Sequence, residues 1–122
     1  MARILVVEDD RDFCESLTRF LSAVGHIAIC EGDGRAALKS LLKHDPDLIL
    51  LDLKLPVMDG LAFLKVVRSY VRFRSIPVFV MTGISDEGAL ANVMDAGATR
   101  VFRKTQFEFG DIRKAIEDEL KT

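Results

Sequence analysis

The feature that most constrains this fold is an apolar run that ends on a single carboxylate. Residues 48–51 read Leu-Ile-Leu-Leu, and Asp52 follows at once. An unbroken apolar run of strand length is typical of a strand buried on both faces, as in a parallel sheet. Pro56 fixes one backbone angle of the next segment, and Asp59-Gly60 is a turn dipeptide that can open a helix. We therefore expect Asp52 where a buried strand meets a loop, the edge at which open α/β sheets bind ligands.

The rest of the chain alternates between short apolar runs and segments with helical periodicity. Apolar residues at steps of three and four predict buried helix faces, and turn residues separate them. Strands that alternate with helices over short connections predict right-handed crossovers onto one parallel sheet, and hence an α/β domain. The expected strands are 3–8, 26–30, 48–51, 78–81 and 99–103, and the expected helices cover about 13–24, 37–42, 60–73, 86–96 and 112–120.

Length and composition set the class of protein. The 122 residues suffice for one domain with a real core, and we find no repeat or linker, so residues 1–122 are expected to be a single domain. The net charge of −2 argues against a dedicated nucleic-acid surface. No apolar run approaches a membrane span, and the first residues lack a signal-peptide pattern, which favours a cytoplasmic protein. Cys14 and Cys30 are accordingly interpreted as reduced, packed side chains.

Chemistry-bearing side chains follow four of the five expected strands. Glu8 and Asp9 come after the first strand, Asp52 after the third, Thr82 after the fourth and Lys104 after the fifth. Because the carboxyl ends of parallel strands meet at one edge, these groups should converge. Carboxylates on adjacent strands repel each other, and a hard divalent cation such as Mg²⁺ relieves that repulsion.

A phosphoryl group fits this set of side chains. An aspartate such as Asp52 can act as a nucleophile and hold a phosphoryl group as an acyl phosphate. Mg²⁺ on one phosphate oxygen and Lys104 on another would neutralise charge during transfer. Thr82 could donate a hydrogen bond to a third oxygen, and Gly83 would keep the approach open.

The pattern resembles the receiver domain of bacterial response regulators in two-component signalling. The resemblance covers essentially the whole chain. It is specific because an acidic pair, an aspartate with spaced proline and Asp-Gly elements, a threonine and a lysine all occur in order. The matching stretches are 6–10, 52–60, 81–83, 95–98 and Lys104.

The resemblance implies a role for each residue of the site. Asp52 is the phosphoryl acceptor, Thr82 is the hydroxyl of the switch, and Lys104 pairs with the phosphate. The implied fold is a flavodoxin-like, doubly wound five-stranded parallel sheet of order 2-1-3-4-5, which places Asp9 beside Asp52. The implied Mg²⁺ ligands are Asp9 directly, Glu8 through water, Asp52, and the backbone carbonyl of Lys54.

The resemblance also implies partners. The phosphoryl donor is a histidine kinase or a phosphotransfer protein, and the chain is a signalling phosphoacceptor that catalyses only its own phosphotransfer and slow autodephosphorylation, not an enzyme. A downstream protein binds the face made by the fourth helix, fifth strand and fifth helix, and a phosphorylation-linked homodimer is left open. Direct nucleic-acid and membrane contacts are not expected. The docking face would include Leu90, Val93, Met94 or their exposed neighbours, and Val101.

Three positions depart from the family. Thr105 replaces the proline, often cis, that commonly follows the lysine, which puts the orientation of Lys104 in question. Val101 replaces the aromatic switch residue, and Phe102 beside it should face the opposite side of the sheet. Ile84 lies where polar residues are common, and we hypothesise that it hinders attacking water and lengthens the phosphorylated state.

Several charged residues have a structural interpretation instead. Asp10 and Asp59 are expected to cap helices. Arg68, Arg72 and Arg74 are interpreted as solvated helix and loop charge.

Three other functions compete with the phosphorylation switch. A haloacid-dehalogenase-type phosphatase needs a second aspartate two residues after the nucleophile, where this chain has Lys54. A flavodoxin-like flavin carrier needs donor groups after the first strand, where Glu8 and Asp9 would repel its phosphate. A degenerate, phosphorylation-independent interaction domain is disfavoured by the intact acidic residues, although Thr105 and Val101 keep it open.

Overall fold

Five parallel strands form one sheet in the order β2-β1-β3-β4-β5, in a computed structural model that describes residues 1–83 and 87–121. The predicted fold class and strand order are both confirmed. Sequential strands change direction across the sheet at β1 and β3, so this pair is the switch point where such folds bind ligands. The strands are β1 (Arg3–Val7), β2 (Ile27–Glu31), β3 (Leu48–Asp52), β4 (Val78–Thr82) and β5 (Arg100–Arg103).

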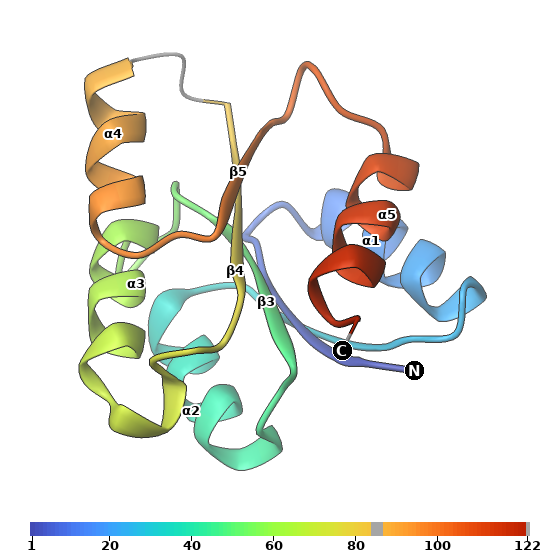
Figure 1. Ribbon diagram of the computed structural model, residues 1–122, viewed down its shortest axis with the longest axis horizontal. Coiled ribbons are helices and arrows are strands. Elements are labelled where there is room, and N and C mark those ends of the chain that lie inside the picture. Colours follow the sequence, from blue (N-terminus) through green and yellow to red (C-terminus); the bar gives the residue numbers. More distant parts are fainter. Residues whose placement is uncertain (84–86, 122) are drawn as a thin grey trace.

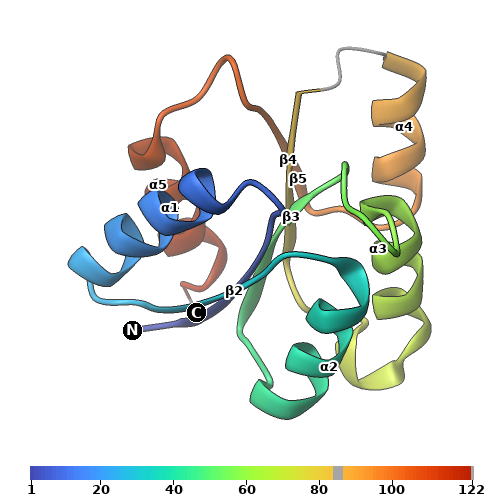
Figure 2. The ribbon, with the colours of Figure 1, turned by 180° about the vertical axis from the view of Figure 1, so that it is seen from behind.

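Helices cover both faces of the sheet (Figures 1 and 2). Helices α1 and α5 lie on one side, and α2, α3 and α4 lie on the other. The N- and C-termini lie close together on the α1–α5 side of the molecule. The helices are α1 (Arg11–Ala23), α2 (Gly34–His44), α3 (Gly60–Ser69), α4 (Glu87–Asp95) and α5 (Phe109–Glu119), with a short 3₁₀ helix η1 (Val71–Phe73) after α3.

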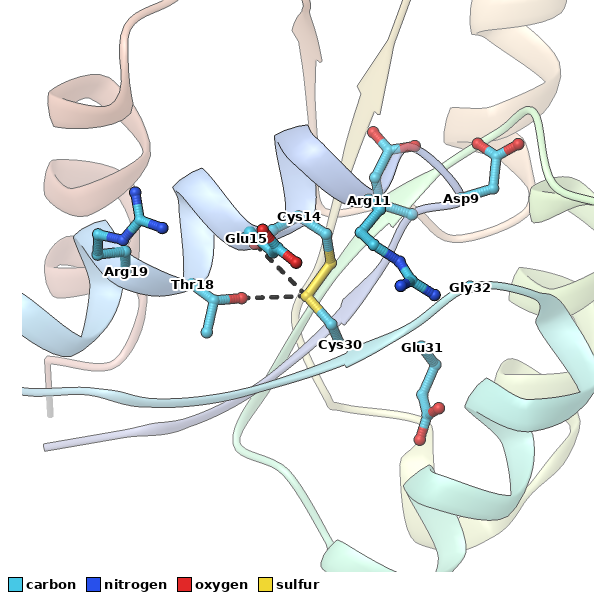
Figure 3. Close-up of a pocket in the computed structure, with 10 residues that line it drawn as sticks. Asp9, Arg11, Cys14, Glu15, Thr18, Arg19, Cys30, Glu31 and Gly32 are labelled. Carbon is cyan, nitrogen blue, oxygen red and sulfur yellow. Dashed lines mark hydrogen bonds between the residues drawn. A yellow bond between two sulfur atoms is a disulfide. The ribbon is translucent and has the colours of Figure 1, made fainter.

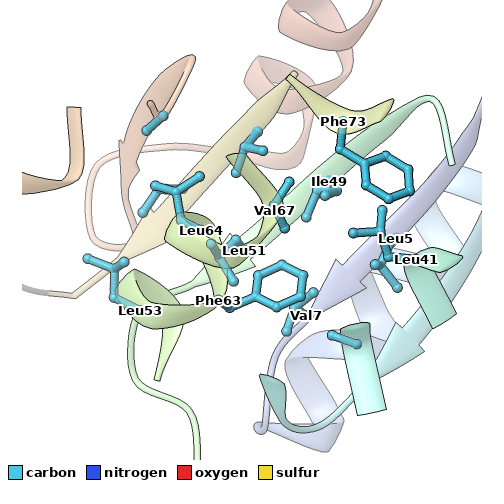
Figure 4. Close-up of a cluster of buried hydrophobic side chains, with 14 of the residues drawn as sticks. Leu5, Val7, Leu41, Ile49, Leu51, Leu53, Phe63, Leu64, Val67 and Phe73 are labelled. Atoms are coloured by element: carbon cyan, nitrogen blue, oxygen red, sulfur yellow. The ribbon is translucent and has the colours of Figure 1, made fainter. Parts of the chain in front are cut away.

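The alternation of side chains along the strands splits the core into two layers. Leu5, Ile49 and Leu51 pack under α2 and α3 (Figure 4), and their neighbours Leu48 and Leu50 pack under α1 and α5. All five residues of β3 are buried, as the unbroken apolar run predicts for a central strand. Because both faces of the sheet are covered by apolar layers, the polar groups gather at the carboxyl ends of the strands.

The third helix is shorter than its periodicity predicts. We expected one helix over 60–73, but α3 ends at Ser69, and Tyr70 adopts extended backbone angles before η1 begins. This break turns Phe73 into the core, where it is 2% exposed. Burial of an aromatic side chain therefore outweighs continuation of the helix.

Helix starts follow their predicted caps. Asp10 accepts a hydrogen bond from the Phe13 N–H, and Asp59 accepts one of 2.8 Å from the Ala62 N–H. These caps satisfy N–H groups that have no partner within the helix. None of the helices within residues 1–83 and 87–121 has the length and apolar character needed to cross a bilayer.

Candidate phosphoryl-transfer and metal site

Asp52 is the last residue of the central strand β3, and the residue is 6% exposed. The Lys54 N–H donates to its Oδ1 at 3.3 Å, and the Lys104 ammonium donates to its Oδ2 at 3.2 Å. Gly60 packs against the same backbone, since a Cβ there would come within 2.6 Å of the Leu53 Cα. The Asp-Gly element thus lets helix α3 start directly against the strand that carries Asp52.

The acidic pair follows β1 and lies level with Asp52. In the parallel register Val7 pairs with Leu51, which places Glu8 next to Asp52. Glu8 is buried at 2% exposure and Asp9 is exposed. The Asp10 N–H donates to Glu8 Oε2 at 3.3 Å, so the backbone itself orients this carboxylate. The sequence-predicted residues therefore meet across the β1–β3 switch point.

Lys104 joins the two buried carboxylates. Its Nζ forms an ion pair with Glu8 Oε1 and with Asp52 Oδ2. Its backbone N–H donates to the Thr82 carbonyl at 2.8 Å, which ties the β5 end to the β4 end. The peptide bonds of the described residues are all trans, so Lys104 reaches the site with Thr105 in place of proline and without a cis bond.

An aromatic ring completes the surroundings of this lysine. Nζ of Lys104 lies 4.6 Å from the centroid of the Phe13 ring, a cation–π distance. Phe13 itself makes an edge contact with Phe109, whose centroid is 5.8 Å away. Phe13 of α1 therefore contacts the lysine, and Phe109 at the start of α5 supports the Phe13 ring. Helical periodicity in the sequence predicts only that Phe13 lies on the buried face of the helix expected over 13–24.

Burial and crowding change the ionisation of Glu8. Desolvation, followed by the hydrogen bond and charge of Asp52, raises the pKa of Glu8 from 4.5 to about 7, against the opposing effect of Lys104. Burial lowers the pKa of Lys104, but its hydrogen bond to Glu8 and the charges of Asp52 and Glu8 outweigh this and leave the pKa raised. The site is a crowded pair of carboxylates with one ammonium.

The donor set fits a hard divalent cation. Carboxylate oxygens of Glu8, Asp9 and Asp52 lie within 4.8 Å of one another. Burial and the neighbouring Asp52 raise the pKa of Glu8, and a cation would offset both effects by stabilising the ionised carboxylate. Oxygen donors are what Mg²⁺ prefers. Lys54 borders the same space, because Asp9, Lys54 and Asp59 line one pocket of about 380 Å³.

The remaining predicted residues occupy the edge of this site or lie beyond it. Thr82 ends β4 at 1% exposure, and Gly83 is exposed with nothing within 4 Å of where a Cβ would stand. Ile84, which we expected to hinder attacking water, lies outside the described residues. Val101 packs toward the α2–α4 layer and Phe102 toward the α1–α5 layer, as alternation predicts.

The predicted docking face needs correction. Leu90 and Val93 are 8% and 2% exposed, so they are core residues and not contact residues. Val101 is half-buried against the same layer. Met94 is 47% exposed and remains the predicted residue that α4 presents to solvent. The apolar stripe of this helix faces inward because it covers the sheet.

The cysteine interpretation is wrong. Cys14 of α1 and Cys30 of β2 are joined by a disulfide, with Cα atoms 6.4 Å apart (Figure 3). No sequence spacing signals this pair, but Cys30 is two residues after Ala28, which packs in the α1–α5 layer. Strand alternation therefore aims Cys30 at α1, where Cys14 lies on the buried face.

Arg68 is also not the solvated charge that we expected. Its Nε and Nη2 donate to the Gly97 carbonyl at 3.1 and 2.8 Å, and its Nη1 donates to the Phe73 carbonyl at 2.9 Å. Burial lowers its pKa. Arg72, by contrast, is half-exposed and pairs with exposed Asp45 at 3.2 Å. Arginine at a helix end gives no sequence signal that separates these two situations.

Comparison with known proteins agrees with this site. The response regulator receiver domain family matches residues 4–117. The response regulator MprA of Mycolicibacterium vanbaalenii is 38% identical over 96 residues, covering 79% of this chain and 41% of that protein. The DNA-binding response regulator MtrA of Mycobacterium tuberculosis is 36% identical over the same shares. The chain thus spans about two fifths of the length of these curated relatives.

A solved structure extends the similarity to the fold. The receiver domain of the sensor histidine kinase PA1611 from Pseudomonas aeruginosa PAO1 superposes with a TM-score of 0.89 at 25% identity, covering 99% of this chain and 98% of that one. That structure has a magnesium ion coordinated in its active-site cleft. The family match, the strand order and the convergence of acidic residues with a lysine lead to one conclusion: this chain belongs to the receiver domain family of two-component response regulators.

Proposed function

We propose that this receiver domain accepts a phosphoryl group on Asp52. The observation that carries the proposal is the Lys104 ammonium, which contacts the carboxylates of both Glu8 and Asp52 at the switch point of the sheet. A structural ion pair needs one carboxylate, whereas a second acid beside it raises the electrostatic cost. A site that must neutralise a phosphoryl group has a use for both the cation and the clustered acids.

Each residue has a defined task in the proposed transfer. A carboxylate oxygen of Asp52 attacks phosphorus, the bond from phosphorus to the donor imidazole nitrogen breaks, and the electron pair of that bond returns to the nitrogen. Lys104 then exchanges part of its contact with the Asp52 carboxylate for a phosphoryl oxygen. The Thr82 hydroxyl donates to another phosphoryl oxygen, and Gly83 leaves room for the donor.

Glu8, Asp9, Asp52 and the Lys54 carbonyl would hold Mg²⁺ in this proposal. When bound, Mg²⁺ supplies charge neutralisation on the transferred phosphoryl oxygens. Asp9 is the exposed member of the cluster and so is best placed to bind an ion that keeps several waters. The buried Glu8 is held by the Asp10 N–H and by Lys104, which suits contact through water.

The proposed output is a change in protein binding. The donor is a histidine kinase or phosphotransfer protein, and the expected contact surface is formed by α4, β5 and α5, with Met94 as its exposed apolar residue. MtrA is a DNA-binding regulator, but this chain matches two fifths of it, so the absence of direct nucleic-acid contact stays a prediction. A haloacid-dehalogenase-type phosphatase remains disfavoured, because exposed Lys54 stands where it needs an acid.

Intact mass after incubation with acetyl phosphate tests the proposal. We expect a Mg²⁺-dependent gain of one phosphoryl group in the wild type and none in Asp52→Asn. Asp59→Asn is the matched control, because it replaces an aspartate by asparagine in the segment that follows Asp52. Asp59 is a helix cap, and asparagine caps equally well. A folded wild type that binds Mg²⁺ without gaining mass would overturn the proposal in favour of a phosphorylation-independent interaction domain.

A further inference from the structure

The Cys14–Cys30 disulfide joins a buried sulfur to an exposed residue. Cys14 is 4% exposed and lies in the first turns of α1, whereas Cys30 lies on the edge strand β2 and is exposed. The Thr18 hydroxyl lies 3.0 Å from Cys30 Sγ. Because Cys30 is the exposed residue of the pair, an attacking thiolate reaches the bond at Cys30, and Cys14 is the sulfur that leaves.

A pocket of about 530 Å³ opens onto this bond (Figure 3). Both cysteines line it, together with residues Glu8 and Asp9 of the metal site. Its volume lies in the range of sites for small organic molecules. It also presents arginine and glutamate side chains, which can pair with the two carboxylates and the ammonium of a tripeptide thiol such as glutathione. The charged residues of the wall beyond the metal site are Arg11, Glu15, Arg19 and Glu31.

We propose that Cys14 and Cys30 form a site of reversible oxidation that exchanges with glutathione in this pocket. We further infer that the oxidised state strengthens Mg²⁺ binding by the adjacent carboxylates. The exchange depends only on the cysteine pair and its pocket, whereas the second inference rests on the metal site of the proposed function.

The two steps of exchange balance without another reagent. The thiolate of one glutathione attacks Cys30 Sγ, the Cys14–Cys30 bond breaks, and Cys14 leaves as a thiolate that takes up a proton. A second glutathione thiolate attacks the mixed disulfide at the glutathione sulfur and releases the Cys30 thiolate. The products are a protein dithiol and glutathione disulfide, and the reverse sequence restores the bond.

Two backbone contacts connect this bond to the acidic pair. The Cys14 N–H donates to the Asp10 carbonyl at 3.0 Å, and the Glu8 N–H donates to the Glu31 carbonyl at 3.0 Å. The disulfide thus ties helix α1, which begins after its cap Asp10, to strand β2, which supports Glu8. Fixing both segments pre-organises the two carboxylates, which favours the metal-bound geometry.

Reduction should leave the domain folded. Leu17 and Leu21 hold α1 against the sheet at 0% exposure, and Asp10 caps the helix without help from either sulfur. The effect of reduction is therefore confined to the segments beside the pocket. This independence makes the exchange reversible, since neither state requires unfolding.

Equilibration in buffers of varied glutathione to glutathione disulfide ratio tests the exchange. Rapid alkylation of free thiols and intact mass measurement give the oxidised fraction, and peptide mapping identifies the bond. We expect a single reversible transition between two free thiols and none, through a mixed disulfide on Cys30 that is trapped in Cys14→Ala. Two free thiols at every ratio, or a bond that no ratio reduces, would each overturn the proposal.

Calorimetric titration with Mg²⁺ tests the coupling. The oxidised protein is expected to bind Mg²⁺ about fivefold more tightly than the reduced protein, and by linkage Mg²⁺ must shift the glutathione midpoint by the same factor. The double variant Cys14→Ala/Cys30→Ala is the control, and its affinity must not vary with glutathione. Equal affinities of the two states would overturn the coupling. A protein that shows both shifts but accepts no phosphoryl group would contradict only the proposed function.

Discussion

At the scale of single residues, the site depends on how Lys104 is held. Its ammonium contacts two carboxylates on one side and the Phe13 ring on the other. The carboxylates favour the protonated ammonium, and the ring limits the positions that the flexible lysine side chain can adopt. This is a way to position a lysine in a loop that lacks the proline common to the family.

We expect Phe13→Leu to slow the phosphorylation of Asp52 about fivefold, because a cation–π contact of this kind contributes about 1 kcal/mol. Leucine keeps an apolar side chain against the α1–α5 layer but has no ring face. Phe20→Leu is the matched control, since Phe20 packs against the same Phe109 ring, at 5.5 Å, without contacting Lys104. Equal rates in both variants, measured with acetyl phosphate, would assign Phe13 to packing alone.

Val57 carries a different residue-scale feature, a positive φ of 69° in the loop after Asp52. Its neighbours Pro56 and Met58 form a 2.7 Å hydrogen bond across it, which closes a tight turn. A β-branched residue is strained in this conformation, and glycine is not. Nothing in the sequence predicts the strain, because valine gives no signal of a turn.

We therefore expect Val57→Gly to raise the free energy of unfolding by about 1 kcal/mol, the strain outweighing the entropy that glycine adds to the unfolded chain. Val71→Gly is the matched control, because Val71 is equally exposed at 75% and has no positive φ. Urea unfolding should show the control destabilised. A loss of stability in Val57→Gly as well would contradict the assignment of strain.

At the scale of elements, the sequence predicts the strands more closely than the bounds of the helices. Helices α1, α2 and α5 begin two or three residues before their expected starts, and α3 ends four residues before its expected end. Apolar runs and the caps Asp10 and Asp59 are local signals, and the structure confirms them. The end of α3 is decided by where Phe73 can be buried, which is a property of the packed core. The residues that converge at the candidate site were predictable for the same reason as the strands, because each lies at or just after the end of one.

The contacts of Arg68 illustrate what local patterns omit. Its guanidinium donates to two carbonyls that lie 5 and 29 residues away, in η1 and in the turn after α4. It therefore joins α3 to both segments. The facing Gly97 has a φ of +108°, and a Cβ there would lie 2.9 Å from the Arg68 Nε.

Arg68→Ala is expected to lower the free energy of unfolding by about 2 kcal/mol, because it leaves partly buried carbonyls without their charged donor. Arg72→Ala is the control from the adjacent η1, where an exposed ion pair to Asp45 and a cation–π contact with the Phe73 ring together contribute about 1 kcal/mol. Chemical denaturation of both variants measures the difference. Equal losses would mean that Arg68 acts only through its aliphatic stem.

At the scale of the whole molecule, the site stores an electrostatic cost that metal binding can relieve. The fold buries Glu8 beside Asp52 and raises its pKa from 4.5 to about 7. In the unfolded chain the same carboxyl ionises at its ordinary value. The difference makes folding and ionisation oppose each other in the metal-free protein.

The sign of this linkage gives the last prediction. Because the folded pKa of Glu8 is above its unfolded value, its contribution to stability is fully present below pH 4.5 and is lost as the pH rises to about 7. The Glu8→Gln variant cannot ionise there, so the free energy of unfolding of wild type relative to this variant should fall across that window in the absence of metal. Above pH 7, Mg²⁺ should restore the wild type, because it binds the folded state alone.

Thermal unfolding of both proteins across this pH range, with chelator and with Mg²⁺, measures each effect. A wild type whose stability follows that of Glu8→Gln at every pH would show that Glu8 ionises normally beside Lys104. In that case the Lys104 ammonium would suffice to neutralise Glu8 and Asp52, and only the charge of Asp9 would call for a second cation. If the free energy of unfolding of the wild type falls with rising pH and Mg²⁺ reverses that fall, the fold holds Glu8 and Asp52 in an unfavourable arrangement that the metal relieves.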